Sequence, residues 1–346
     1  MTNKKIFDYS TGPKIVAEIS ANHDGSLKQA LELVHAAAEA GAHAVKLQTF
    51  LPQTMTLNSD HKDFVIQDEN NLWNGYRLFD LYQKAYTPWE WHEEIFELAK
   101  KLGIIGFSSA FDVTSVDFLE SISVPCYKVA SFESIDTTLI ARIAATRKPM
   151  IISTGMANIS EIALSVKVAV ENGCDNLSLL KCTSAYPASN LETNLRAIPV
   201  MREAFQLPVG LSDHTLGIGA AVASVALGSV MIEKHIKISK DSNSLDAKFS
   251  LDPGRLRDLV VETQNAFECL GVGAIGPTAS EMSSRSRRRS LYFSKAVKSG
   301  DLITKDNIQS VRPGFGLEPQ YFEKILGMRV ARDVEMGTPL DWDILK

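Results

Sequence analysis

The sequence predicts an α/β fold in which eight parallel strands and eight helices form a closed (β/α)8 barrel, followed by a small β-rich module. Short β-branched runs alternate eight times with longer helical patterns. Several of these runs are apolar throughout, as in strands that are buried on both faces. The 346 residues are enough for a barrel of about 250 residues and one further module.

The expected strands are rich in β-branched residues, and they lie at residues 14–20, 44–48, 104–109, 126–130, 150–153, 177–181, 209–212 and 229–236. Apolar residues at helical spacing follow each strand, at residues 27–40, 89–102, 115–121, 138–145, 161–171, 195–204, 219–226 and 254–270. The rival fold is a doubly wound open sheet. It normally needs fewer strands, and no Gly-x-Gly-x-x-Gly motif follows the first strand here.

The connection at residues 50–88 is too long for an ordinary loop between a strand and a helix. Its second half has helical spacing, and it should leave the end of the barrel at which active sites lie. Two alternatives stay open: a helix packed on the barrel surface, or a lid over the strand ends. The aromatic residues Trp73, Tyr76 and Trp89 could cover a bound substrate or only anchor the segment.

The alternating pattern changes near residue 276. Short segments separated by Gly and Pro turns then predict a β-rich module that is small enough to need support from another surface. We therefore expect a barrel domain at residues 1–276, a linker at 277–289 and a small domain at 290–346. The linker carries an arginine run, which is either a solvated segment or a phosphate contact.

Composition excludes several classes of protein. The formal net charge of −5 argues against a nucleic-acid-binding surface. The four cysteines show no metal-binding or paired spacing, which suits a reducing compartment. No segment reaches the roughly 20 apolar residues of a membrane-spanning helix, and the amino-terminal stretch has no apolar signal-peptide core. We expect a cytoplasmic protein with no nucleic-acid or membrane partner.

Every predicted strand ends in ionisable or hydroxyl side chains, where structural turns would favour Gly, Asn and Pro. Four lysines lie near the ends of alternate strands: Lys46, Lys128, Lys181 and Lys234. Alternate strands of a barrel contribute side chains to one layer, so a cationic mouth would suit a phosphate or carboxylate ligand. A single lysine of this kind is more often a surface charge.

Two histidines, His214 and His235, end the neighbouring strands 7 and 8. Adjacent strands are about 4.8 Å apart, so both imidazoles could bind one divalent ion, Mn²⁺, Mg²⁺ or Zn²⁺, together with water and substrate oxygens. Either histidine alone is better explained as structural. Because residues alternate between the faces of a strand, Glu233 should face the same side as His235, and Lys234 the opposite side.

Two carboxylates, Glu18 and Glu133, lie at strand ends in different parts of the ring. One of them could orient a sugar hydroxyl, transfer a proton or activate a water molecule. Each is equally well explained as the ion-pair partner of a lysine in the same ring.

Seven motifs follow one another at these strand ends: AEISANHDGS, AVKLQTF, YKVASFES, IISTGM, LLKCTSAYP, GLSDHT and IEKHI. Together with RRRSLYFSKAVKSGD and SVRPGFG, they resemble the sialic acid synthase family, including its antifreeze-like (SAF) domain. The resemblance covers nearly the whole chain and implies a TIM barrel followed by a SAF domain. The strings ISANHDGSL, TPWEWH and FSSAFD most closely resemble the pseudaminic acid synthases of that family.

The resemblance implies a metal-dependent transferase that condenses phosphoenolpyruvate with 2,4-diacetamido-2,4,6-trideoxy-L-altropyranose. Water adds at C2, and C–O cleavage releases phosphate. The same chemistry on another sugar would make an N-acetylneuraminate or legionaminic acid synthase. Two other rivals are an aldolase that forms a Schiff base on Lys128 or Lys181 and a carbohydrate-binding protein without catalysis.

The resemblance also implies roles for individual residues. His214 and His235 match the metal ligands of the family, with Mn²⁺ or Mg²⁺ as the implied ion. Glu18 and Glu133 match acidic residues near the sugar and the reacting centre, and Asp246 matches a sugar contact.

The positions that match the phosphoenolpyruvate-binding residues of the family are Lys46, Lys128, Ser131, Ser153, Ser184 and Ser212. The chain departs from the sialic acid synthases at Ser184, where they usually have Asn, and at Lys181, where they have His. Arg312 matches an arginine that reaches the partner's active site in a domain-swapped homodimer.

Overall fold

The computed structural model describes residues 6–69 and 71–346. The chain divides into two compact units, of which the first ends at Gly271 and the second begins at Val272. The first five residues, part of the stretch in which we expected no signal peptide, lie outside the described residues, as does residue 70 of the long connection.

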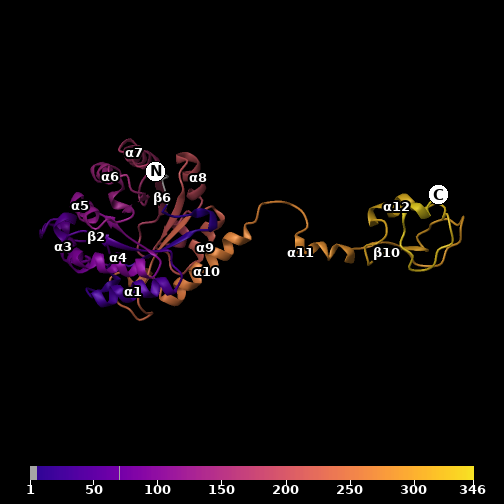
Figure 1. Cartoon of the computed structure of the whole chain (residues 1–346), viewed down its shortest axis with the longest axis horizontal. Coiled ribbons are helices and arrows are strands. Elements are labelled where there is room, and N and C mark those ends of the chain that lie inside the picture. The colour runs from indigo at the N-terminus through magenta and orange to yellow at the C-terminus, as the bar shows by residue number, and fades with distance from the viewer. Residues whose placement is uncertain (1–5, 70) are drawn as a thin grey trace. The chain divides into compact units, whose positions relative to one another are not determined.

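The first unit is a closed barrel of eight parallel strands, in which β8 pairs with β1 (Figure 1). The strands are β1 (Lys14–Glu18), β2 (Ala44–Thr49), β3 (Ile105–Ala110), β4 (Tyr127–Val129), β5 (Met150–Ser153), β6 (Leu177–Cys182), β7 (Val209–Asp213) and β8 (Met231–His235). The predicted barrel is therefore confirmed, with most strand ends shifted by one or two residues.

A helix follows each strand on the outside of the barrel (Figure 1). These helices are α1 (Leu27–Glu39), α4 (His92–Lys101), α5 (Val113–Ser121), α6 (Thr137–Ala144), α7 (Ile159–Glu171), α8 (Ala197–Phe205), α9 (Gly219–Ala226) and α10 (Pro253–Cys269). Local chemistry sets their starts: Asn158 caps α7 by accepting from two backbone N–H groups, and Asp252 caps α10 before Pro253. No helix in the described part of the chain is long and apolar enough to cross a bilayer.

The barrel strands are almost completely buried. Every residue of β1, β4, β5, β6, β7 and β8 is buried, as the apolar runs predicted. Polar side chains that face into the barrel at the carboxyl ends of these strands are therefore buried as well. Burying them is costly unless they are paired with other polar groups or with a ligand.

The long connection between β2 and α4 is built on aromatic contacts. It contains α2 (Pro52–Met55) and α3 (Leu78–Ala85). The ring of Phe50 packs edge-on against Tyr82 and Phe111 at centroid separations of 5.7 and 5.3 Å. The Trp89 ring stacks on Phe118 at 4.6 Å, and its indole N–H donates to the Phe50 carbonyl at 3.3 Å. Trp89 therefore anchors the end of this segment.

The second unit has its own small apolar core, to which Leu291, Phe293 and Val330 contribute. Its regular elements are α11 (Ala279–Met282), β9 (Ser290–Phe293), β10 (Ile308–Val311) and α12 (Phe322–Ile325). β9 and β10 pair antiparallel, and turns make up much of the remainder. The helix α11 lies within the stretch that we expected to be a linker.

Candidate active site

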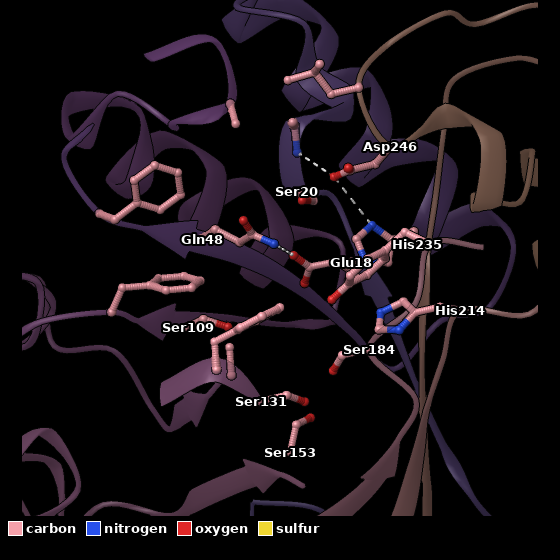
Figure 2. Close-up of a pocket in the computed structure, with 18 of the residues that line it drawn as sticks. Glu18, Ser20, Gln48, Ser109, Ser131, Ser153, Ser184, His214, His235 and Asp246 are labelled. Atoms are coloured by element: carbon pink, nitrogen blue, oxygen red, sulfur yellow. Dashed lines mark hydrogen bonds and ion pairs between the residues drawn. The ribbon is translucent and has the colours of Figure 1, made fainter. Parts of the chain in front are cut away.

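A cavity of about 510 Å³ lies at the carboxyl ends of the barrel strands. Each strand contributes at least one side chain to its wall, and these include Glu18, Lys46, Ser109, Lys128, Ser153, Cys182, Ser212, Glu233 and His235. Figure 2 shows several of them converging on one space. All predicted site residues of the barrel, from Glu18 to Asp246, line this cavity.

Two buried lysines form the cationic part of the wall. The Lys46 Nζ atom lies 2.6 Å from Oε2 of Glu18 and 3.6 Å from Oε1 of Glu233, and it donates to Ser109 Oγ at 2.9 Å. Burial lowers the pKa of Lys46, but Glu18 and Glu233 outweigh burial and raise it, so the ammonium stays charged. Lys128 Nζ lies 3.4 Å from Oε2 of Glu233, and burial lowers its pKa.

Glu233, which contacts both lysines, is a cavity residue that we did not assign to the site from the sequence. Burial disfavours its charge, but Lys128 and Lys46 outweigh burial and lower its pKa to about 2. Its carboxylate also accepts from Ser212 Oγ at 3.2 Å. The alternation along β8 did predict that Glu233 faces the same side as His235, and that signal would have sufficed to find it.

Four of the serines that we predicted from the sequence line the same cavity as the two lysines. The serines are Ser131, Ser153, Ser184 and Ser212. Ser131 Oγ accepts from the Gly155 N–H at 3.1 Å, and a Cβ at Gly155 would lie 2.2 Å from Ser184 Oγ, so only glycine fits there. Ser153 Oγ is buried and has no hydrogen-bond partner among the described residues. A buried, unpaired hydroxyl in a cavity wall is available to form a hydrogen bond to a ligand.

The two histidines lie beside each other across the ends of β7 and β8, with ring centroids 5.4 Å apart (Figure 2). His214 Nδ1 is 3.0 Å from the Thr183 carbonyl, so in the neutral ring Nδ1 carries the proton and Nε2 keeps a free lone pair. His235 Nδ1 has no hydrogen-bond partner within the described chain. Burial lowers the pKa of His235 well below its ordinary value, which favours the neutral ring that binds metals.

These observations fit a divalent cation held by the two imidazoles. Among the described residues, no group of three or more His, Cys, Asp or Glu side chains could hold an ion. An ion at His214 and His235 would therefore have two protein ligands from this set and open positions for oxygen ligands, as Mn²⁺ and Mg²⁺ accept.

Two more carboxyl groups reach the cavity. Glu133 lies in the short 3-10 turn Phe132–Ile135 after β4, and burial raises its pKa to about 7. Its Oε2 atom is buried and makes no hydrogen bond to any described residue. Asp246 Oδ2 accepts from the Ala21 N–H at 3.4 Å and lies 3.7 Å from His235 Nδ1 (Figure 2).

Glu18, by contrast, forms an ion pair within the cavity wall. Besides its ion pair with Lys46, it accepts from Gln48 Nε2 at 3.0 Å (Figure 2). Burial raises its pKa to about 7 against the opposing effect of Lys46. The sequence left two explanations open for each glutamate, a role in the reaction or an ion pair with a lysine. Glu18 forms such an ion pair, whereas Glu133 forms none within the described residues.

The long connection forms the apolar side of the cavity. Trp73 and Tyr82 line it together with Tyr186 and Phe249, and the Trp73 and Tyr186 rings lie 5.8 Å apart. Tyr76 is not part of the wall and is partly exposed beneath Lys84. This segment thus covers the strand ends, and Trp73 is the one of the three aromatic residues considered from the sequence that lines the cavity.

The lysine pattern that we expected on alternate strands holds for only two of its four members. Lys181 donates to Thr183 Oγ1 at 2.5 Å, and Lys234 pairs with Asp213. Neither lines the cavity. The expectation of one shared layer was wrong for Lys181, because the inward position at the end of β6 belongs to Cys182. For Lys234, the alternation along β8 had already predicted that the side chain faces away from Glu233 and His235. We overlooked Cys182, which lies 3.8 Å from His214 Nδ1.

Arg312 belongs to the second unit. It follows β10 directly, and its side chain is exposed. Its expected approach to the active site of a partner subunit stays a prediction.

A closed (β/α)8 barrel with a cationic, hydroxyl-lined cavity at its strand ends places the chain in the class of TIM-barrel enzymes. Residues 33–274 match the model of the NeuB family, and residues 288–346 match that of the SAF domain. The chain belongs to the NeuB family. The predicted resemblance to the sialic acid synthases and their SAF domain is confirmed.

Relatives and solved structures agree with this assignment. The chain is 42% identical to a pseudaminic acid synthase of Campylobacter jejuni over 98% of this chain and 96% of the relative. It is 40% identical to a pseudaminic acid synthase of Helicobacter pylori over 96% of this chain and 97% of the relative. The crystal structure of an N-acetylneuraminic acid synthetase from Leptospira borgpetersenii, in complex with citrate, has a TM-score of 0.71 at 29% identity and covers 81% of this chain and 95% of that one.

Proposed function

We propose that this protein condenses phosphoenolpyruvate with 2,4-diacetamido-2,4,6-trideoxy-L-altropyranose to make pseudaminic acid. C3 of phosphoenolpyruvate bonds to the aldehyde carbon of the open-chain sugar, and the oxygen of a water molecule bonds to C2. The bond between C2 and the phosphate oxygen then breaks and releases phosphate. The observation that carries this proposal is one cavity that holds a lysine and serine cradle, a free carboxyl group and two histidines.

The cradle suits the two anionic groups of phosphoenolpyruvate. Lys46 and Lys128 are buried and held by carboxylates, and the unpaired Ser153 hydroxyl is free to donate a hydrogen bond to a substrate oxygen. A phosphate or carboxylate bound there would gain charge-assisted hydrogen bonds in a site shielded from water. The lysines would stay in place during the reaction, so their charge would be preorganised for the phosphate that leaves.

Glu133 is the group best suited to move a proton. Its pKa of about 7 leaves both protonation states populated near neutrality, and its Oε2 atom is unengaged within the described residues. It would accept the proton of the water molecule that attacks C2. Glu18 would instead orient Lys46, to which it is paired.

A divalent ion, Mn²⁺ or Mg²⁺, held by His214 and His235 would supply Lewis-acid polarisation of the aldehyde oxygen. Asp246, which lies beside His235 and accepts from the Ala21 N–H, would accept a hydrogen bond from a sugar hydroxyl. Burial raises the pKa of Asp246 above its ordinary value, because burial disfavours the charged carboxylate.

The apolar side of the cavity supports the choice of sugar. A 6-deoxy sugar with two acetamido groups is less polar than N-acetylmannosamine, and Trp73, Tyr82 and Tyr186 offer aromatic faces to it. The 40–42% identity to two pseudaminic acid synthases supports the same choice.

We further propose that two copies form a domain-swapped homodimer, in which Arg312 of one copy reaches the active site of the other, and that the reaction takes place in the cytoplasm. Light scattering tests the dimer. In a mixture of Arg312→Ala with His214→Ala, subunit exchange should restore part of the activity, because one of the two sites then has a complete set of residues. A fully active monomer would remove Arg312 from the site.

Phosphate release from phosphoenolpyruvate, with Mn²⁺ present, tests the reaction directly. We expect release with the trideoxy-altrose sugar and not with N-acetylmannosamine or the legionaminic acid precursor. Release with one of the other sugars would keep the reaction and correct the substrate. Borohydride trapping with pyruvate should give no adduct, because an adduct would indicate a Schiff-base aldolase.

A further inference from the structure

Lys234 is a buried cation that the proposed reaction does not use. Its side chain is fully buried on the outer face of β8 and does not line the cavity. Its Nζ atom donates to Oδ2 of Asp213 at 2.8 Å and to the carbonyl oxygen of Thr215 at 2.5 Å. A buried ion pair of this kind usually gains little stability over an apolar pair of similar volume, so its presence calls for another explanation.

The three residues of this cluster flank the two histidines. Lys234 directly precedes His235, while Asp213 and Thr215 lie on either side of His214. Asp213 and Lys234 are also directly paired in the ladder between β7 and β8. The ammonium group of Lys234 therefore bonds to Asp213 and to Thr215, the two residues on either side of His214.

Further bonds make this arrangement stiff. Asp213 Oδ1 accepts from the Thr215 N–H at 2.9 Å and from its hydroxyl at 2.8 Å, which closes a tight turn around His214. On the other side, the His214 carbonyl accepts from the Ala188 N–H at 2.9 Å. The backbone of His214 is therefore held both by a neighbouring loop and, through Asp213 and Thr215, by Lys234.

We propose that Lys234 and Asp213 are a positioning pair that fixes the spacing of His214 and His235 for a divalent cation. This inference rests on the metal site of the proposed function. Successive residues of a strand point to opposite faces, so the pair can act from behind the strands without touching substrate. Groups that orient metal ligands in this indirect way commonly change metal affinity by about 10- to 100-fold.

The test is Mn²⁺ binding by calorimetry to the full-length protein, without substrates. The double variant Asp213→Asn/Lys234→Met removes both charges together, keeps the side-chain oxygen that accepts from Thr215, and leaves no unpaired buried ion. We expect its Mn²⁺ affinity to fall by about 10- to 100-fold, with circular dichroism and metal-free binding of phosphoenolpyruvate unchanged. The matched control is Lys14→Met. It removes a buried lysine at the amino-terminal end of β1, away from the cavity, and should keep wild-type Mn²⁺ affinity.

A folded double variant with wild-type Mn²⁺ affinity overturns the proposal. If the double variant does not fold, Asp213→Asn alone is measured, and wild-type affinity there has the same meaning. Wild-type protein that binds no Mn²⁺ would overturn both the metal site and the positioning pair. Wild-type protein that binds Mn²⁺ but releases no phosphate would refute the proposed reaction alone, because the affinity comparison would still decide the role of the pair.

Discussion

The Nζ atom of Lys46 lies 2.6 Å from Oε2 of Glu18, which is its neighbour on the adjacent barrel strand, and both side chains are almost fully buried. In the proposed complex, Lys46 would share its charge between this carboxylate and the anionic substrate. Glu18 therefore holds the ammonium in the cavity before phosphoenolpyruvate arrives. The effect of this ion pair on phosphoenolpyruvate binding and its effect on the stability of the protein can be separated by mutation.

Replacing Lys46 by Met should raise KM for phosphoenolpyruvate by about 10- to 100-fold, because a charge-assisted hydrogen bond of about 1.5–3 kcal/mol is lost. It should also lower the melting temperature, since Glu18 loses its partner. Adding Glu18→Gln should restore the melting temperature but not the affinity. Lys167→Met, at an exposed position on α7, is the control. An unchanged KM in Lys46→Met would place phosphoenolpyruvate elsewhere.

The pH dependence of kcat/KM should report Glu133. Its pKa is raised by burial to about 7 from an ordinary value near 4.5, so it is protonated below neutrality and ionised above it. A group that accepts a proton must be ionised, so kcat/KM should rise with pH up to about 7 and then level off. In Glu133→Gln this rise should disappear, and the rate should fall by about 10²- to 10⁴-fold.

Glu18→Gln is the matched comparison, because burial raises the pKa of Glu18 to about 7 as well. This variant should keep the rise of kcat/KM with pH. If the rise instead persists in Glu133→Gln and is lost in Glu18→Gln, Glu18 is the proton acceptor and the assignment made above is wrong.

Trp73 should influence the sugar and not phosphoenolpyruvate. Its ring lies in the apolar wall, 5.8 Å from that of Tyr186. Trp73→Ala should raise KM for the sugar by about 2- to 10-fold, as expected for the loss of one aromatic contact, and leave KM for phosphoenolpyruvate unchanged. Tyr76→Ala alters an aromatic residue of the same segment outside the cavity and should affect neither constant. Equal effects of the two variants would mean that the segment is only an anchor.

Metal removal should abolish phosphate release, and added Mn²⁺ should restore it. By calorimetry, His214→Ala and His235→Ala should each lose Mn²⁺ affinity by more than about 100-fold, since each removes a direct ligand. His35→Ala, at an exposed position on α1, should bind Mn²⁺ normally. Full activity after exhaustive chelation would exclude the metal from the mechanism.

Much of this protein could be predicted from its sequence because the rules involved are local. The period of apolar residues gave the strands and helices, and their alternation gave the barrel. The carboxyl ends of parallel strands meet at one rim, so residues as far apart in the chain as Glu18 and His235 could be assigned to one cavity. The two-residue period of β8 also separated Glu233 and His235 from Lys234.

Other features depended on contacts between distant segments, which no local pattern encodes. The sequence left Glu18 and Glu133 equivalent. Only packing pairs Glu18 with Lys46 and leaves Oε2 of Glu133 without a hydrogen bond among the described residues. Likewise, the position of the long connection was open until Trp73 was found against Tyr186. Periodicity along the chain thus determined the elements and the rim, whereas the partner of each buried charge was decided by the tertiary structure, because charges pair across space and not along the sequence.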